Sequence, residues 1–240
     1  DQAGNEGLVR REIKVINPEI ANGLKVLTFI VRESSAIVTG CTKSASGAIE
    51  IPSTYKGKPV TSIQEKAFHL CKSLTSITIP NSVEFIGKST FEGCESLSSV
   101  IIGSSVTSIA EKAFMNCSEL KSVTIPDSVA QSESFPIQKY AFNKCTSLID
   151  FTIPDSVTSI GNSAFENCRS LTSVTIPDKV ASIEKKTFSY CINLESVTIS
   201  DNVTSIGAYA FHYCRSLTDI TIPDGVTIIE IDAFSRCESL

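Results

Sequence analysis

The chain has 240 residues, 42% of them apolar, and a formal net charge of -5 at neutral pH. This apolar fraction is typical of a folded protein and excludes intrinsic disorder. The acidic balance argues against a nucleic-acid partner, whose phosphates require clustered Lys and Arg. No apolar run approaches the ~18 residues that a membrane-spanning helix needs.

The first 59 residues lack the pattern that fills the rest of the chain. Residues 1–20 are mostly polar, and we expect them to form a flexible N-terminal segment. Residues 21–59 are expected to form an N-terminal cap and the lead-in to the first repeat, because the stretches 24–32 and 36–39 are typical of a small β-hairpin. Residues 49–52 then copy the strand and proline of the later repeats.

Residues 60–240 consist of eight copies of one unit, which recurs every 23 residues except for one interval of 28. Each copy carries the motif Phe-x-x-Cys-x-x-Leu, which begins at Phe68, Phe91, Phe114, Phe142, Phe165, Phe188, Phe211 and Phe234. A fixed period of this length predicts a solenoid, in which each unit buries its apolar face only against its neighbours.

Eight columns of apolar or small residues recur in every unit, and we expect them to face inward. The pattern Leu-x-x-Val-x-Ile, as in residues 171–176, predicts a strand with Val174 and Ile176 inward. Pro177 then closes the strand, since proline donates no ladder hydrogen bond. The pattern Val-x-x-Ile indicates a second, short extended segment, and x-x-Ala-Phe-x-x-Cys indicates one helical or 3-10 turn.

The long interval arises from five extra residues between Val129 and Ile137, and it predicts a surface loop over residues 130–136. This insertion carries an aromatic residue, Phe135, which either folds back on the solenoid or serves as a binding anchor. The chain stops at Leu240, before the strand that its own repeat requires. We therefore expect a C-terminally truncated solenoid, followed by more repeats or a cap in the full-length protein.

Nine cysteines are present, and eight of them occupy one position of the repeat. They lie three residues after the Phe and three before the Leu, so we expect buried, reduced thiols, since free Cys behaves as a small hydrophobe. Disulfides between stacked turns and zinc binding are the alternatives. The odd count, the absence of a C-x-x-C pair and the presence of only His69 and His212 argue against both. We expect no metal and no cofactor.

The unit Phe-x-x-Cys-x-Ser-Leu-x-Ser-Val-Thr-Ile-Pro-Asp-Ser-Val-Thr-Ser-Ile-Gly-x-x-Ala is readable almost verbatim over residues 142–164. It resembles the BspA-like leucine-rich repeats, and residues 51–63 look like the first repeat of that family. The resemblance covers about residues 36–240. It implies an α/β-type solenoid that is curved and right-handed, with a parallel β-sheet. It also implies a bacterial or protozoan surface protein, and some members of the family adhere to host proteins.

No catalytic constellation is present, since the chain contains no G-x-S-x-G, H-E-x-x-H or P-loop motif. A repeated pattern also argues against an active site, which is singular. We therefore expect a non-enzymatic protein. A row of acidic residues follows the strand prolines, and it indicates either turn chemistry or a site for a cation or a basic partner. These residues are Asp127, Asp155, Asp178, Asp201 and Asp224.

The outward positions of the predicted strands are mostly Ser and Thr. Small hydroxyls there are either tolerated strand residues, a strip that binds a protein, or a lattice that matches ice. We predict the second, with Asp150 and Asp219 on its face and Lys121 and Glu195 at its margin. Charge would then select the partner, and the loop with Phe135 would clamp it from the side. The predicted protein-binding residues are Thr78, Lys121, Thr124, Phe135, Asp150, Thr152, Thr175, Glu195, Thr198, Asp219 and Thr221. The expected partner is a protein, such as a host extracellular-matrix or surface protein, and the expected location is the cell surface or extracellular space. The alternative is a structural spacer that presents another domain.

Overall fold

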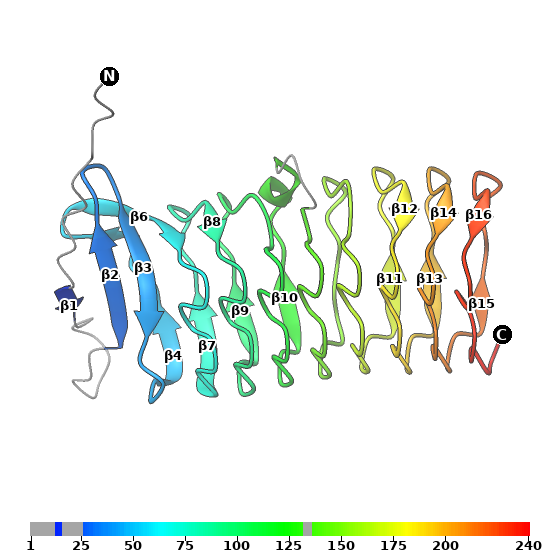
Figure 1. Ribbon diagram of the computed structural model, residues 1–240, viewed down its shortest axis with the longest axis horizontal. Coiled ribbons are helices and arrows are strands. Elements are labelled where there is room, and N and C mark those ends of the chain that lie inside the picture. The colour runs from blue at the N-terminus through cyan, green and yellow to red at the C-terminus, as the bar shows by residue number, and fades with distance from the viewer. Residues whose placement is uncertain (1–12, 16–25, 132–135) are drawn as a thin grey trace, which may run out of the picture.

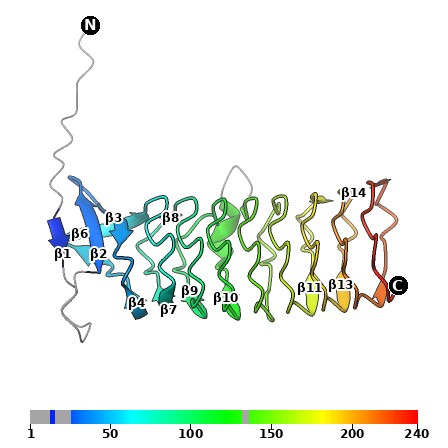
Figure 2. The ribbon, with the colours of Figure 1, turned by 60° about the horizontal axis from the view of Figure 1, so that its bottom comes forward.

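The computed structural model describes residues 13–15, 26–131 and 136–240, and it is a solenoid of similar coils stacked along one long axis (Figure 1). Among these residues the only helix is a short 3-10 helix, η1, at Asp127–Gln131. The expected repeat solenoid with parallel β-sheet is therefore confirmed. Figure 2 shows the cap strands at one end of the row and the C-terminus at the other.

The N-terminal cap is built from antiparallel strands, which confirms the predicted hairpin. Strand β2 pairs with both β1 and β3 in antiparallel fashion, and β3 then pairs in parallel with β6 of the first repeat. The short strand β5 folds back on β6, and the rings of Phe29 and Tyr55 stack with centroids 4.3 Å apart. The strands of this region are β1 (Ile13–Val15), β2 (Leu27–Val31), β3 (Ala36–Cys41), β5 (Thr54–Tyr55) and β6 (Lys58–Ile63). The rest of the segment 1–20 lies outside the described residues.

One parallel ladder follows the predicted Leu-x-x-Val-x-Ile strands, and it consists of two sheets. Each residue pairs with its equivalent in the next coil, as Val123 does with Val100. A single bridge between Ser122 and Asp150 joins the first sheet to the repeat that follows it. The first sheet comprises β4 (Ser46–Glu50), β7 (Ser73–Thr78), β9 (Ser99–Ile101) and β10 (Ser122–Thr124). The second comprises β11 (Ser173–Thr175), β13 (Ser196–Thr198) and β15 (Asp219–Ile220).

A second parallel ladder runs along the Val-x-x-Ile segments, as the sequence predicts. It begins where β6 pairs with β8 and continues through isolated bridges between successive Ile residues, such as that between Ile109 and Ile137. It ends in a three-stranded sheet. Its short strands are β8 (Phe85–Ile86), β12 (Ser182–Ile183), β14 (Ser205–Ile206) and β16 (Ile228–Ile229).

The segment around Phe-x-x-Cys is a series of tight turns, and not the helical or 3-10 turn that its length suggests. Two residues of each such segment have left-handed backbone, as Lys66 and Leu70 do with φ of 59°. An α-helix requires a run of right-handed residues, so these positions interrupt it. Instead, Cys71 N donates to Phe68 O at 3.0 Å within the turn, and Phe68 N donates to Thr90 O of the next coil at 2.9 Å.

The core is a set of columns that run along the solenoid axis, and Phe rings form the largest of them. Successive Phe rings stack with centroids 5.0 to 5.6 Å apart, from Phe68 to Phe234. The eight predicted columns are buried in the inner repeats. The ladder cysteines are buried too, except for the half-buried Cys237, and all nine cysteines of the chain are unpaired.

The last coil is less covered than the inner ones. Val226, Phe234 and Cys237 are only partly buried, and Leu240 is 53% exposed, whereas their counterparts in the preceding repeats are fully buried. The exposed isoleucines of this coil lie on and beside β16. Within the described residues no helix has the length and apolar character needed to cross a membrane.

Candidate protein-binding surface

The outward face of the first ladder is a strip of small hydroxyl side chains. Strands β10, β11 and β13 share the sequence Ser-Val-Thr, with the Val buried and the Ser and Thr exposed. Alternate side chains of a strand point to opposite faces, so burying the Val places both hydroxyls outward. The in-register pairing sets Thr175 beside Thr198 and Ser173 beside Ser196. The result is two parallel rows of hydroxyls across neighbouring coils.

The structure places the described members of the predicted site on the outside of the solenoid. Thr78 is partly exposed, and the other predicted residues in the described part of the chain are exposed. Phe135 lies outside the described residues. Pairing brings Thr175 and Thr198 together directly, and Asp219 lies beside Ser196 in the adjacent strand. Thr78 and Thr124 are not adjacent, because a third strand, β9, separates them.

The strip is divided in the middle, which the repeat pattern does not indicate. Thr152 is exposed but belongs to no strand, and its repeat joins the first sheet only through Asp150. The buried position between these two residues holds Phe151 where most repeats have Val or Ile. Its ring packs edge-on against Phe165 at 4.7 Å and tilted against Phe142 at 5.1 Å. This larger side chain accounts for the loss of strand geometry in this coil.

The first half of the strip carries an apolar residue that the predicted site does not include. Ile101 is 63% exposed and lies in register between Thr78 and Thr124. It occupies the position that holds Thr in the neighbouring repeats. An exposed β-branched side chain flanked by hydroxyls is a suitable contact for an apolar group of a partner. The alignment of the repeats carries this signal, since Ile101 is the exception in its column.

Charged side chains are spread unevenly over the strip. Lys121 borders its first half, while Asp150, Glu195 and Asp219 lie in or after the middle, and all four are exposed. Within the described residues none of the four forms an ion pair. These charges therefore remain free to interact with a partner, and the C-terminal half of the strip is acidic.

A shallow groove of about 530 Å³ lies along the turns at a different edge of the coils. It follows the left-handed residues that precede the cysteines, and a mixture of Gly and Asn at this position of the repeat is a sequence signal for such backbone. The predicted site does not include it. The lining residues are Leu70, Gly93, Glu95, Asn116, Ser118, Lys144, Thr146, Asn167 and Arg169.

The same column continues beyond the groove as two stacked tyrosines. The rings of Tyr190 and Tyr213 lie 4.8 Å apart and nearly parallel, and the Arg215 guanidinium covers Tyr213 at 4.9 Å from the ring centroid. His212 packs edge-on against both tyrosines, and its Nδ1 lies 2.5 Å from Ser235 Oγ. Partial burial lowers the pKa of His212, so this cluster carries its positive charge on Arg215 at neutral pH.

Four of the five residues in the acidic row lie in turns, and Asp127 begins η1. Asp178 Oδ1 accepts a hydrogen bond from Ser200 Oγ at 2.9 Å, and Asn81 Oδ1 at an equivalent position accepts one from the Ser104 amide at 2.9 Å. Each bond joins neighbouring coils. Among the described residues no group of three or more His, Cys, Asp or Glu side chains is placed to hold a metal ion. The contacts of Asp178 and Asn81 are those of turn chemistry.

Parallel ladders, stacked Phe columns and a polar strip together define a leucine-rich-repeat solenoid. The chain belongs to the BspA type leucine rich repeat family, whose model matches residues 45–136 and 131–240 in six copies. The resemblance inferred from the repeat motif is thus confirmed. No protein with a curated description matches the chain in sequence.

Several solved structures have the same architecture. The leucine-rich repeat protein of T. pallidum is 30% identical, with a TM-score of 0.71, over 81% of this chain and 89% of its own. A leucine-rich repeat protein of Bacteroides ovatus is 30% identical, with a TM-score of 0.76, over 85% of this chain and 54% of its own. A leucine rich cell surface protein of Faecalibacterium prausnitzii is 31% identical, with a TM-score of 0.56, over 90% of this chain and 52% of its own. The chain spans about half the length of the latter two.

Proposed function

We propose that the chain is a non-enzymatic, cell-surface protein that binds other proteins through its hydroxyl strip, with adhesion to host or matrix proteins as its role. The observation that carries the proposal is the regular, solvent-exposed array of Ser and Thr on two adjoining sheets. Such an array offers hydrogen-bond donors and acceptors on a rigid backbone, which limits the entropy lost on binding.

The location and the partner class are supported by the relatives. The family is one of leucine-rich repeats, whose domains generally mediate protein interactions. One structure similar to this chain is that of a leucine rich cell surface protein. The strip also lacks the clustered basic residues that nucleic acid demands, since Asp150, Glu195 and Asp219 lie along it.

The strip alone is smaller than a stable protein-protein interface. Seven coils that each present about five residues of extended chain give roughly 500–600 Å² from ordinary strand spacings, whereas a stable interface takes about 800 Å² from each partner. A partner must therefore contact neighbouring surfaces as well. We propose that the insertion at 130–136 contributes to this contact, with Phe135 as an aromatic anchor.

The proposal is tested with matched lysine variants. Replacing Thr152, Thr175 and Thr198 with Lys places three cations on the exposed strip, and it should weaken binding to a panel of immobilised extracellular-matrix proteins at least tenfold. The control replaces Thr158, Thr204 and Thr227 with Lys, since these threonines are also exposed but follow the Val column. Both variants should melt within a few degrees of the parent, because all six side chains face solvent.

Three outcomes decide between the alternatives. Selective loss of binding in the strip variant supports the proposal. Equal binding by parent, strip variant and control shows that the ligand uses another face. Failure of the parent to bind any surface or matrix protein favours the structural spacer, in which the coils only extend another domain. Deleting residues 131–135 restores a regular repeat, and it should also weaken binding if the insertion contributes.

A further inference from the structure

The ninth cysteine, Cys41, lies outside the ladder, at the end of β3 in an incomplete first coil. The amide of Ala45 donates to Thr42 O at 3.0 Å, which reproduces the bond from Cys71 N to Phe68 O in the next coil. Thr42 therefore occupies the place of the ladder Phe, and Ala45 occupies the place of the ladder Cys. Cys41 sits where the following coils have Ala or Thr.

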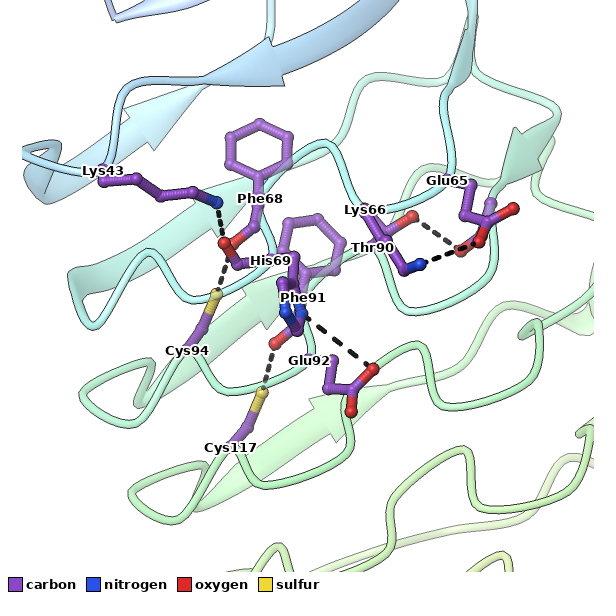
Figure 3. A network of polar contacts seen from close by, with 11 residues as sticks. Lys43, Glu65, Lys66, Phe68, His69, Thr90, Phe91, Glu92, Cys94 and Cys117 are labelled. Carbon is purple, nitrogen blue, oxygen red and sulfur yellow. Dashed lines mark hydrogen bonds and ion pairs between the residues drawn. The ribbon is translucent and has the colours of Figure 1, made fainter.

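Cys41 and Cys71 are hydrogen-bonded to one carbonyl oxygen. Cys41 Sγ donates to Thr42 O at 3.5 Å, and Cys71 Sγ donates to the same oxygen at 3.7 Å. The two sulfurs thus cannot be farther apart than the sum of these distances. In the following coils each such carbonyl accepts from only one thiol, as Phe68 O does from Cys94 and Phe91 O from Cys117 (Figure 3).

The electrostatics of this pair differ from those of the inner ladder. The interaction with the neighbouring Cys71 thiol, and then burial, raise the pKa of Cys41. The interaction with Cys41 lowers the pKa of Cys71 against the opposing effect of burial, and the nearby Lys43 ammonium lowers it further. Lys43 is held in place by its contact with His69 O (Figure 3). Of the two thiols, Cys71 is therefore the one that gives up its proton more readily.

We propose that Cys41 and Cys71 form a redox-active pair, which a disulfide-class oxidant such as oxidised glutathione converts into an intramolecular disulfide between the cap and the first repeat. Cys41 is partly exposed, whereas Cys71 is buried. The oxidant therefore meets Cys41 first. The Cys41 sulfur loses its proton and attacks one sulfur of the oxidised glutathione, which forms a mixed disulfide and releases one reduced glutathione. Cys71 then gives up its proton, and its sulfur attacks the Cys41 sulfur and releases the second glutathione. The two thiol protons and two electrons end on the two reduced glutathiones.

The other seven thiols are not expected to be oxidised. Six of them are fully buried, and burial raises the pKa of each: Cys94, Cys117, Cys145, Cys168, Cys191 and Cys214. Cys237 is half-buried like Cys41, but it lies at the opposite end of the solenoid. Oxidation is thus expected at one place only, where it ties β3 of the cap to the turn of the first repeat.

The folded protein is incubated with oxidised glutathione near neutral pH, and its intact mass and non-reduced peptides are measured. The expected result is loss of the mass of two hydrogen atoms, a peptide that joins Cys41 to Cys71, and a count of free thiols in denaturant that falls by two from nine. Dithiothreitol should restore all nine thiols. Oxidation should accelerate with rising pH, because Cys41 holds its proton in the first step.

The variants Cys41→Ser and Cys237→Ser are matched, since both remove a half-buried thiol at one end of the solenoid. Cys41→Ser should abolish the disulfide, and Cys237→Ser should oxidise as the parent does. Three results would overturn the proposal. They are a parent that keeps nine thiols, a glutathione adduct that stays on Cys41, and a disulfide that persists in Cys41→Ser.

Discussion

A ladder cysteine of the inner repeats has a closed environment. The Cys145 thiol is fully buried and donates to Phe114 O at 3.2 Å, and Cys168 donates to Phe142 O at the same distance. Burial raises the pKa of both thiols well above the usual value, and it raises the pKa of Cys94 to about 12. These thiols stay protonated at neutral pH, so they act as small apolar groups that also satisfy a carbonyl.

The raised pKa values predict a loss of stability at alkaline pH. In the unfolded chain each thiol ionises above about pH 8.5, while in the folded chain it keeps its proton. The unfolded state then binds fewer protons, so the free energy of unfolding falls as pH rises, by about 1.4 kcal/mol per pH unit for each such thiol. Urea unfolding at about pH 8 and about pH 10 measures the effect.

Removing a single ladder thiol separates its effect on stability from that of lysines and tyrosines, which titrate in the same pH range. Cys145→Ala should be less stable than the parent at about pH 8, but its further loss up to about pH 10 should be smaller by about 1–2 kcal/mol. The other titrating groups are common to both proteins and cancel in this comparison. An equal loss in both proteins would show that Cys145 ionises as readily in the folded state as in the unfolded chain.

The sequence identifies the inward residues well, since the repeat aligns eight equivalent positions and an apolar column is unmistakable over eight copies. It does not distinguish Cys71 from Cys145, although they occupy the same column. Their difference comes from Cys41 and Lys43, which lie in a region without the motif. The alignment of the repeats does place Ile101 among outward threonines, and the structure adds its direct pairing with Thr78 and Thr124.

Among the elements, the turns around the cysteines have the least common backbone conformation. The residue before each Cys has left-handed backbone in every repeat, and it is Gly93 in the second and Asn116 in the third. In an L-residue with a Cβ this conformation costs about 1–2 kcal/mol. The turns therefore hold strain that the ladder hydrogen bonds and the buried Phe and Cys side chains offset.

Substituting Gly93 tests this strain. Gly93 has φ of 73°, so Gly93→Ala should lower the free energy of unfolding by about 1–2 kcal/mol in urea titrations. An added Cβ would also approach Leu70 Cδ2 to 2.6 Å, but that side-chain end can move. The matched control is Asn116→Gly, which should change stability by only a few tenths of a kcal/mol, because both residues accept this backbone. A Gly93→Ala protein as stable as the parent would contradict the assignment of strain.

Element types were partly predictable from the sequence. Period-2 alternation predicts the strands of the first ladder correctly, because β-branched residues at Val174 and Ile176 fit a pleated, half-buried surface. The extended segments of the second ladder follow from the Val-x-x-Ile pattern. The prediction of a helical turn around the cysteines was wrong. Residue propensity does not reveal a left-handed backbone at positions that hold Lys, Tyr or Ser. The division of the strip was missed as well, since Phe151 is apolar like the rest of its column and differs only in volume.

At the scale of the whole molecule, stability is expected to decline towards the C-terminal end of the 240-residue chain. An inner amide such as Phe211 N donates to Ala233 O of the next coil at 2.8 Å, whereas Phe234 has no following coil. Hydrogen exchange should therefore be fastest in residues 226–240 and slower in residues 157–200. Mass-spectrometric exchange of the monomer checks this directly.

Equal protection of the two regions would contradict this expectation and would mean that the open end is covered. The exposed Ile228, Ile229 and Ile231 provide an apolar surface for such a contact. Size-exclusion chromatography across a range of concentrations separates self-association from intrinsic stability of the last coil. Protection that disappears on dilution would identify a second copy as the cover.

The five-residue insertion leaves the Phe column undisturbed. The rings of Phe114 and Phe142, which flank it, are 5.3 Å apart, compared with 5.2 and 5.4 Å for the adjoining pairs. Two coils therefore stack at the same spacing whether or not the chain that connects them carries the insertion. A gene built from such interchangeable units can gain, lose or exchange one by recombination and still encode a continuous core. The exposed face of the coils can then diversify rapidly under selection, while the scaffold beneath it is inherited unchanged.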